Sequence, residues 1–324
     1  MTPKLNELGE REIISRLRRT FRFDSPQDDC ALINDGNNYL MVTTDSINFR
    51  THIPSGTPPD LAGSYFAALN LSDIAAMAGK PIEFLTAYSL NPDTEYDMLE
   101  KFESGMVKVL KEYDCDFAGG DLKEGEGLTM TGIALGRQKK QLTRKRSDIA
   151  PDQVIGVTNT LGRSAAGYVL YSHNLRKQAA IRMMLDIKPR IREAQIISEH
   201  GGKFMMDLSD GVASSMRQMK RDYGIGFRVV QDEIPVHTEV RKAIELSGIP
   251  ELEFTLGFGG DYELFFSVEN GNYPDFKAAM ESEKINVSFI GDAWKGDNII
   301  YNGSEWNPLQ LNGYEHFRKN NLVH

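Results

Sequence analysis

The stretch LAGSYFAALNLSDIAAMAG, residues 61–79, combines an apolar helical pattern with a single carboxylate, Asp73. Its alanine-rich composition and the spacing of its apolar residues predict a helix with one continuous apolar face. Asp73 lies on that face, which carries no Lys, Arg or His before Lys80. A buried carboxylate is costly unless a positive charge pairs with it. Asp73 therefore either caps a second short helix after a break at Ser72, or it meets a metal ion that arrives with a ligand.

The composition of the 324 residues limits the class of protein. The length suggests two domains, each with its own core. Asp and Glu outnumber Lys and Arg by 46 to 37, and the net charge of −9 argues against general nucleic-acid binding and against an anionic membrane surface. The two cysteines are far apart in the sequence, so neither a disulfide framework nor a zinc site is expected. The charged N-terminus predicts no signal peptide, and no apolar run approaches the ~20 residues that cross a bilayer, so we expect a cytoplasmic protein.

Strands and helices are predicted to alternate along the whole chain. A helix is expected over residues 7–21, followed by a hairpin whose second strand, YLMVTTD, ends at Asp45. Pro81 is expected to stop the helix that contains Asp73. The segment CDFAGGDL predicts a short buried strand that ends in a Gly-Gly-Asp turn. This alternation predicts an α/β (α+β) architecture for both halves.

A basic stretch between Gly136 and Asp152 is the candidate domain boundary. It is short, it lacks interleaved aromatic residues and it lies in an acidic chain, so a solvated linker or a phosphate-binding arm is favoured over a nucleic-acid patch. We expect an N-terminal domain over residues 1–138, a linker over 139–152 and a C-terminal α/β domain over 153–324.

Carboxylates recur where a strand or a helix reaches a turn. They occur in Asp28-Asp29, in Thr43-Thr44-Asp45, at Asp73, at Asp121 after Gly119-Gly120, at Asp207 and Asp210, and at Asp261 after Gly259-Gly260. Each one alone is typical of a helix cap or a strand end. If the fold brings them together, cations must neutralise their charge. Hard oxygen ligands of this kind favour Mg²⁺.

Nucleotide binding is the natural companion of such a site, because Mg²⁺ usually accompanies phosphate. The common phosphate loops GxxxxGK[ST] and GxGxxG are absent from the sequence, as are the HRD and DFG motifs of protein kinases. Phosphates would then be held by metal ions, by the backbone amides of Gly119-Gly120, by the N-terminus of the helix after Asp210 and by an arginine.

Short motifs along nearly the whole chain carry a resemblance to a known family. They are DDCALI, VTTDSINFRTHIP, NLSDIAAMAGKP, FAGGD, LTRKRSDIAPDQVIGVTNTLGRSAAG, KPR, MDLSDGVASS, GGDYELFF and NGYEHF. In these motifs and in their order, the chain resembles thiamine-monophosphate kinases. That family belongs to the ATP-binding superfamily that includes aminoimidazole ribonucleotide synthetase and selenophosphate synthetase. The match is specific, because NLSDIAAMAG and DLSDG occur in register with GGD and DYEL.

The resemblance implies roles for the residues at the matching positions. The implied catalytic residues are Asp45, Asp73 and Asp207, with Asp73 touching several Mg²⁺ ions. The implied metal ligands are Asp29, Thr43, Thr44, Asp45, Asp73, Asp121, Asp207 and Asp210. The implied nucleotide contacts are Gly120, Asp121, Arg146 and Ser209. The implied contacts to thiamine monophosphate are His52, Asp261 and Tyr314; without the resemblance, His52 would be a surface histidine and Tyr314 a packing residue.

Three positions depart from the family pattern. Gln27 replaces a glycine before the Asp pair, Leu122 replaces a threonine after Gly-Gly-Asp, and Gly260 replaces an acidic residue before Asp261. None of them removes a carboxylate assigned to metal. The change at Gly260 affects the expected geometry on the substrate side.

The resemblance further implies an enzyme that uses ATP to phosphorylate thiamine monophosphate to thiamine diphosphate. The transfer would be direct and in line, assisted by several Mg²⁺ ions, and it needs no strong general base because the acceptor phosphate is already ionised at neutral pH. The family architecture implies a homodimer in which the N-terminal sheets of two subunits form a shared barrel. Two alternatives stay open: another ATP-dependent ligase or dehydratase of the superfamily with a different small acceptor, and a non-catalytic nucleotide-binding protein.

Overall fold

The N-terminal helices precede two β-sheets in the computed structural model, which describes residues 3–22 and 28–311. The predicted helix over 7–21 corresponds to two helices, α1 (Leu5–Leu8) and α2 (Glu10–Phe21). Gly9, with a φ of 81°, separates them, because this backbone conformation is open to glycine and costly for other residues.

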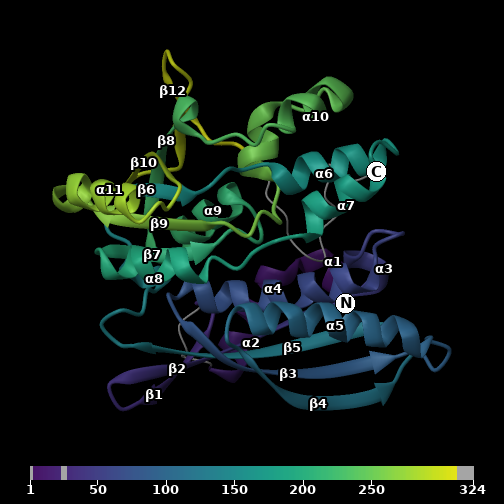
Figure 1. Ribbon diagram of the computed structural model, residues 1–324. Coiled ribbons are helices and arrows are strands. Elements are labelled where there is room, and N and C mark those ends of the chain that lie inside the picture. Colours follow the sequence, from purple (N-terminus) through teal and green to yellow (C-terminus); the bar gives the residue numbers. More distant parts are fainter. Residues whose placement is uncertain (1–2, 23–27, 312–324) are drawn as a thin grey trace.

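The first sheet contains five strands in the order β1-β2-β5-β3-β4 (Figure 1). Its strands are β1 (Ala31–Asp35), β2 (Asn38–Asn48), β3 (Lys80–Leu90), β4 (Asp116–Glu124) and β5 (Thr129–Lys139). Only β3 and β4 are parallel among these neighbours. The hairpin of β1 and β2 is confirmed, but the predicted strand end at Asp45 is wrong. Pairing with β5 carries β2 on to Asn48, opposite Thr129, so Asp45 lies within a strand.

The alanine-rich stretch of residues 61–79 forms most of a single helix, α4 (Pro59–Ala76), that is continuous through Ser72 and Asp73. The alternative of a helix break at Ser72 is therefore wrong. The predicted stop at Pro81 is also wrong: the chain turns at Ala78, which has a φ of 59°, and Pro81 already belongs to β3. After the short helix α3 (Phe49–His52), α4 and α5 (Tyr96–Glu112) cover one face of the first sheet (Figure 1).

Two glycines set the close packing of α4 against α5. A Cβ atom at Gly63 would lie 1.8 Å from the carbonyl oxygen of Phe102, and one at Gly105 would lie 1.8 Å from that of Asp60. Only glycine permits such a close approach of two backbones. The two helices thus form one rigid layer on the sheet.

The prediction of a short buried strand that ends in a Gly-Gly-Asp turn is wrong for β4 (Asp116–Glu124). The strand continues through Gly-Gly-Asp to Glu124, and its residues are mostly exposed in the single chain. It is the edge strand of the sheet, so β3 pairs with one side of it only.

The second sheet contains seven strands in the order β12-β11-β8-β10-β6-β9-β7. Its strands are β6 (Gln153–Thr158), β7 (Gly202–Asp207), β8 (Gly226–Val230), β9 (Leu264–Glu269), β10 (Val287–Trp294), β11 (Ile299–Tyr301) and β12 (Trp306–Pro308). The helices around it are α6 (Arg163–Ser172), α7 (Lys177–Leu185), α8 (Ile191–Glu199), α9 (Val212–Tyr223), α10 (Val240–Ser247) and α11 (Tyr273–Ser282). Short 3₁₀ turns are η1 (Arg146–Asp148), η2 (Gln231–Glu233) and η4 (Asn270–Asn272), and η3 (Glu253–Gly257) is a π-helical turn. The predicted mixed α/β fold is confirmed.

Helix α4 lies between the two halves of the molecule (Figure 1). One side packs on β2 and β5, and the other contacts α8 and β7. The largest apolar cluster accordingly combines Phe66 and Ile74 of α4 with Met205 and Phe266 of the second sheet. The division at 139–152 stays a prediction; β5 ends at Lys139 and β6 begins at Gln153. Within the described ranges, no helix combines the length and the apolar character that a membrane span requires.

Candidate active site

Three carboxylates meet where α4 passes between the two sheets. Ligand oxygens of Asp29, Asp73 and Asp207 all lie within 4.8 Å of one another. They come from the residues before β1, from the last turns of α4 and from the end of β7. Asp45 and Asp210 lie beside them, within electrostatic reach. The fold thus gathers five of the carboxylates that the sequence assigned to metal.

Helix α4 supplies two consecutive side chains to this cluster. Oδ2 of Asp73 accepts a hydrogen bond of 2.5 Å from Oγ1 of Thr43 on β2. Ser72 donates to Oδ2 of Asp207 at 2.8 Å, and Ser209 donates to Oδ1 of Asp207 at 3.2 Å. Thr43, predicted as a metal ligand, and Ser209, predicted as a nucleotide contact, each donate a hydrogen bond to a carboxylate of the cluster. Asp73 does not cap a helix here.

Thr44 points away from the cluster. Side chains alternate along a strand, so Thr43 and Asp45 share the face of β2 that α4 covers, and Thr44 lies on the other face. Its hydroxyl donates to the carbonyl oxygen of Gly132 at 2.9 Å. A contact of Thr44 to a metal would therefore use its backbone oxygen.

Buried Asn70 of α4, which the sequence did not single out, accepts a hydrogen bond from the Asp45 amide at 2.9 Å.

Arg146 is paired with the acidic cluster. Its Nη2 and Nε atoms donate to the two oxygens of Asp29 at 2.5 and 3.2 Å, and its backbone amide donates to Asp28 at 3.0 Å. The Asp29 side chain is only 2% exposed. Burial works against the charge of the guanidinium, but Asp29 outweighs burial and raises the pKa of Arg146. The predicted phosphate-binding arginine thus lies directly beside the predicted metal ligands.

One arginine does not neutralise this group of acids. Burial, with the charge of Asp29 next in size, raises the pKa of Asp207 to about 7. Burial and the neighbouring carboxylates also raise the pKa of Asp73 well above its usual value. Oδ2 of Asp28 is buried and has no hydrogen-bond partner among the described residues. A set of crowded, oxygen-only donors with unbalanced negative charge fits a hard divalent cation such as Mg²⁺.

Helix α2 reaches the same region through Arg11, which the sequence analysis missed. Its guanidinium lies 3.6 Å from Oδ2 of Asp210 and donates to Oγ of Ser214 on α9. In the sequence, Arg11 belongs to a charged amphipathic helix and has no local signal that distinguishes it from a solvated residue. Its position beside Asp210 and Ser214 depends on where α2 packs in the folded chain.

Gly120 and Asp121 are not part of this cluster in the single chain. They lie on the edge strand β4, where the Asp121 side chain is 64% exposed and lies 3.5 Å from the ammonium of Lys123. A Cβ atom at Gly120 would lie 2.1 Å from the carbonyl oxygen of Thr86, so glycine is needed for the pairing of β4 with β3.

The predicted substrate contacts lie at two places. His52 ends α3, and its Nδ1 accepts a hydrogen bond from the Asn48 amide at 3.1 Å. Asp261 accepts from the amides of Gly162 and Ser164, at 2.6 and 2.9 Å, at the start of α6. Burial raises the pKa of Asp261 to about 6, against the effect of these two hydrogen bonds. Tyr314 lies outside the described residues.

Two further contacts, both missed in the sequence, fix the turn that carries Asp261. Tyr262 adopts a left-handed conformation, with a φ of 51°, and its hydroxyl lies 3.2 Å from that of Tyr65 on α4. Glu263 accepts two hydrogen bonds from Arg190, at 2.5 and 2.8 Å, and one from Thr158 at 2.6 Å. A buried, fully bonded carboxylate of this kind holds a backbone segment in one position.

The fold occurs in several solved structures. A structure described as AaThiL complexed with AMPPCP and TMP matches with a TM-score of 0.87, at 24% identity over 98% of this chain and 99% of that chain. Thiamine-monophosphate kinase from Stenotrophomonas maltophilia matches with a TM-score of 0.74, at 26% identity over 89% and 95% of the two chains. The hydrogenase maturation protein HypE of E. coli matches with a TM-score of 0.70 at 19% identity, over 93% and 97%. The fold alone therefore does not select a substrate.

Sequence comparison is more specific. The family model described as AIR synthase related protein, N-terminal domain, matches residues 27–138. The thiamine-monophosphate kinase of Buchnera aphidicola is 32% identical over 300 residues, covering 90% of this chain and 91% of the relative. The thiamine-monophosphate kinase of Escherichia coli is 31% identical over 302 residues and 90% of both chains. With this identity over nine-tenths of each sequence, the chain belongs to the thiamine-monophosphate kinase family.

Proposed function

We propose that this protein transfers the γ-phosphoryl group of ATP to thiamine monophosphate, giving ADP and thiamine diphosphate. The observation that carries the proposal is the cluster of Asp29, Asp73 and Asp207, whose ligand oxygens lie within 4.8 Å of one another. The names of the relatives and the description of a structural match with AMPPCP and TMP support the choice of substrates.

The residues that would hold Mg²⁺ are those that the fold gathers around α4. They are Asp29, Asp45, Asp73, Asp207 and Asp210, with Thr43 orienting Asp73. When bound, Mg²⁺ supplies positive charge that offsets the repulsion between the phosphates of donor and acceptor. Asp73 would be the central ligand of this set, because the charges of Asp45, Asp207 and Asp29 all act on it.

The remaining task of the protein is to position two phosphates in line. Arg146 offers a guanidinium beside Asp29, and its planar fork suits phosphate oxygens. Ser209 and the N-terminus of α9 follow β7 directly, and the first turn of α9 contains no acidic residue. Helix N-termini attract anions, so this end of α9 is suited to a nucleotide phosphate.

The substrate side is proposed to involve His52, Asp261 and Tyr314. A thiazolium cation is stabilised by a carboxylate or by an aromatic face. Asp261 is held by two amide donors, and a carboxylate keeps further acceptor capacity when it has accepted two hydrogen bonds. The neighbouring pair Tyr65 and Tyr262 adds aromatic surface at the same turn.

We infer a homodimer from the face of the first sheet opposite α4 and α5. By strand register, this face carries half-exposed or exposed apolar side chains from four strands. They are Ile33, Leu40, Val42, Leu85, Ile133 and Leu135. Asp121 shares this face, since it pairs with Ala87 in the register of β3 and β4. A second subunit packed here, as in a shared barrel, would cover the apolar face and bring Asp121 toward a nucleotide site.

One assay separates this function from its alternatives. Purified protein is incubated with ATP, Mg²⁺ and thiamine monophosphate, and thiamine diphosphate and ADP are quantified by chromatography. The proposal expects equal amounts of both products and none in EDTA. ADP formation only with other small acceptors would instead identify a ligase or dehydratase. Absence of Mg²⁺-dependent ADP formation with every acceptor would identify a non-catalytic nucleotide-binding protein.

A further inference from the structure

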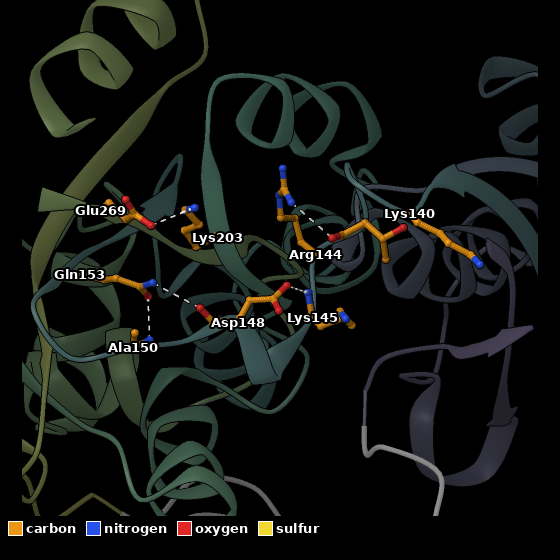
Figure 2. A pocket seen from close by; sticks show the side chains of 9 residues that line it. Lys140, Arg144, Lys145, Asp148, Ala150, Gln153, Lys203 and Glu269 are labelled. Atoms are coloured by element: carbon orange, nitrogen blue, oxygen red, sulfur yellow. Dashed lines mark hydrogen bonds and ion pairs between the residues drawn. The ribbon is translucent and has the colours of Figure 1, made fainter. Parts of the chain in front are cut away.

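A second polar site lies at the junction of the two sheets, where the chain leaves β5 for β6. It is a hollow of about 450 Å³. Charged residues of the linker and of the edge of the second sheet line it (Figure 2). They are Lys140, Arg144, Lys145, Asp148, Lys203 and Glu269. The hollow shares no residue with the acidic cluster.

The two carboxylates of the hollow are already engaged. Glu269 lies 2.9 Å from the ammonium of Lys203, and Asp148 accepts a hydrogen bond of 3.0 Å from the Lys145 amide (Figure 2). Four basic residues face these two acids, so the lining carries a net positive charge. This is unusual in a chain whose net charge is −9.

Arg144 is the most constrained of these cations. Among the described residues, its guanidinium donates to three backbone carbonyls, of Ser198 at 2.8 Å, Gln141 at 3.2 Å and Thr143 at 3.4 Å, and its Nε is buried with no partner. In the part of the chain that the structure describes, neither Arg144 nor Lys145 has a carboxylate within 4 Å. Burial lowers the pKa of Arg144, and the charge of Asp148 opposes this only in part. A half-buried guanidinium with no carboxylate in hydrogen-bond contact favours an anion as ligand.

We propose that this hollow binds a phosphate-type oxyanion, either free phosphate or the terminal phosphate of a larger molecule. Arg144 contributes its positive charge, and Lys145 and Lys203 provide ammonium groups from the linker and from β7. The volume falls within the range of about 300–1,000 Å³ typical of small-molecule sites. Because the cations belong to both the linker and the second sheet, the bound anion ties the two together and stabilises the folded protein.

The test is calorimetric titration of the full chain with sodium phosphate, pyrophosphate and ADP in separate experiments. EDTA removes metal ions that would hold anions at the acidic cluster, and the ionic strength is kept constant. The variant is Lys145→Gln with Lys203→Gln. The matched control is Lys108→Gln with Lys277→Gln, two exposed lysines elsewhere with the same change in charge. Wild type and control are expected to bind with equal affinity, and the variant at least about tenfold more weakly, because charge-assisted hydrogen bonds are lost.

The three probes distinguish the source of the phosphate. Binding of phosphate or pyrophosphate identifies a free anion, whereas binding of ADP alone, lost in the variant, identifies the end of a larger molecule. Equal affinity of variant and control, or no saturable binding of any probe, overturns the proposal. Loss of binding in Arg146→Gln, with Lys145→Gln/Lys203→Gln unchanged, also overturns it, since the anion would then lie in the catalytic cleft.

Discussion

At the scale of single residues, Asp73 lies where the first and the second sheet contribute side chains to the same acidic cluster. It contacts Thr43 of the first sheet, while its neighbour Ser72 contacts Asp207 of the second. The crowding that raises the pKa of Asp73 is costly without a cation, so the residue is poorly explained by stability alone. We expect its replacement to affect activity and folding in opposite directions.

Asp73→Asn is predicted to lower kcat by on the order of 10²–10³-fold or more, because a preorganised charge at the transferring phosphate is lost. In EDTA, its thermal midpoint at pH 8 is predicted to rise above that of wild type, because burying this carboxyl among like charges costs free energy that a neutral amide does not. Turnover and thermal unfolding check both effects, with Asp275→Asn as an exposed control. Unchanged turnover at saturating Mg²⁺ would contradict the assignment.

Asp261 predicts a pH dependence of stability. Its pKa of about 6 in the folded protein lies above the usual 3.8, so the folded state binds more protons than the unfolded state between pH 4 and 6. The unfolding free energy of wild type, relative to Asp261→Asn, is therefore predicted to fall by about 1–3 kcal/mol as the pH rises from 4 to 7. Urea unfolding of both proteins across this range measures the difference. A constant or growing advantage of wild type would contradict it.

At the scale of elements, the local sequence predicts what local forces determine. The apolar spacing of residues 61–79 predicted α4, and the turn before β2 predicted the hairpin. The sequence did not predict where β2 ends, because its pairing partners on β5 lie 81 to 101 positions further along the chain. It did not predict the exposure of β4 either, since burial depends on what covers an element rather than on its composition.

Gly105→Ala is predicted to destabilise the protein by about 1–3 kcal/mol or more, because the added methyl would lie 1.8 Å from the Asp60 carbonyl and push α4 from α5. Gly127→Ala is the matched control, since nothing lies within 4 Å of a Cβ atom there. Denaturant unfolding compares the two variants. Equal midpoints would show that the contact between the helices relaxes without cost.

At the scale of the whole molecule, the candidate active site results from the stacking of α4 between the two sheets. The carboxylates Asp29, Asp73 and Asp207 are 44 to 178 positions apart in sequence and meet because α4 lies between the two sheets. The family motifs anticipated this group of acids. Arg11 and Glu263 were not anticipated, because each acts through a contact between elements that no local pattern encodes.

The double variant Leu85→Asp/Ile133→Asp is predicted to be monomeric and to lose most of its kinase activity. Charges on the open face of the first sheet oppose its burial between subunits, and Asp121 would no longer reach a neighbouring site. Sedimentation analysis should give wild type about twice the chain mass of 36.4 kDa and the variant a single chain mass. Leu175→Asp, at an exposed position of the second half, serves as control. A monomeric, fully active wild type would refute the dimer.

A crystal structure with Mn²⁺ and a non-hydrolysable ATP analogue tests the proposed metal site, because anomalous scattering locates the metal. We expect an anomalous peak coordinated by oxygens of Asp29, Asp73 and Asp207, with the analogue phosphates bound to the same ion. Analogue bound with no metal between these three carboxylates, or metal bound only elsewhere, would contradict it.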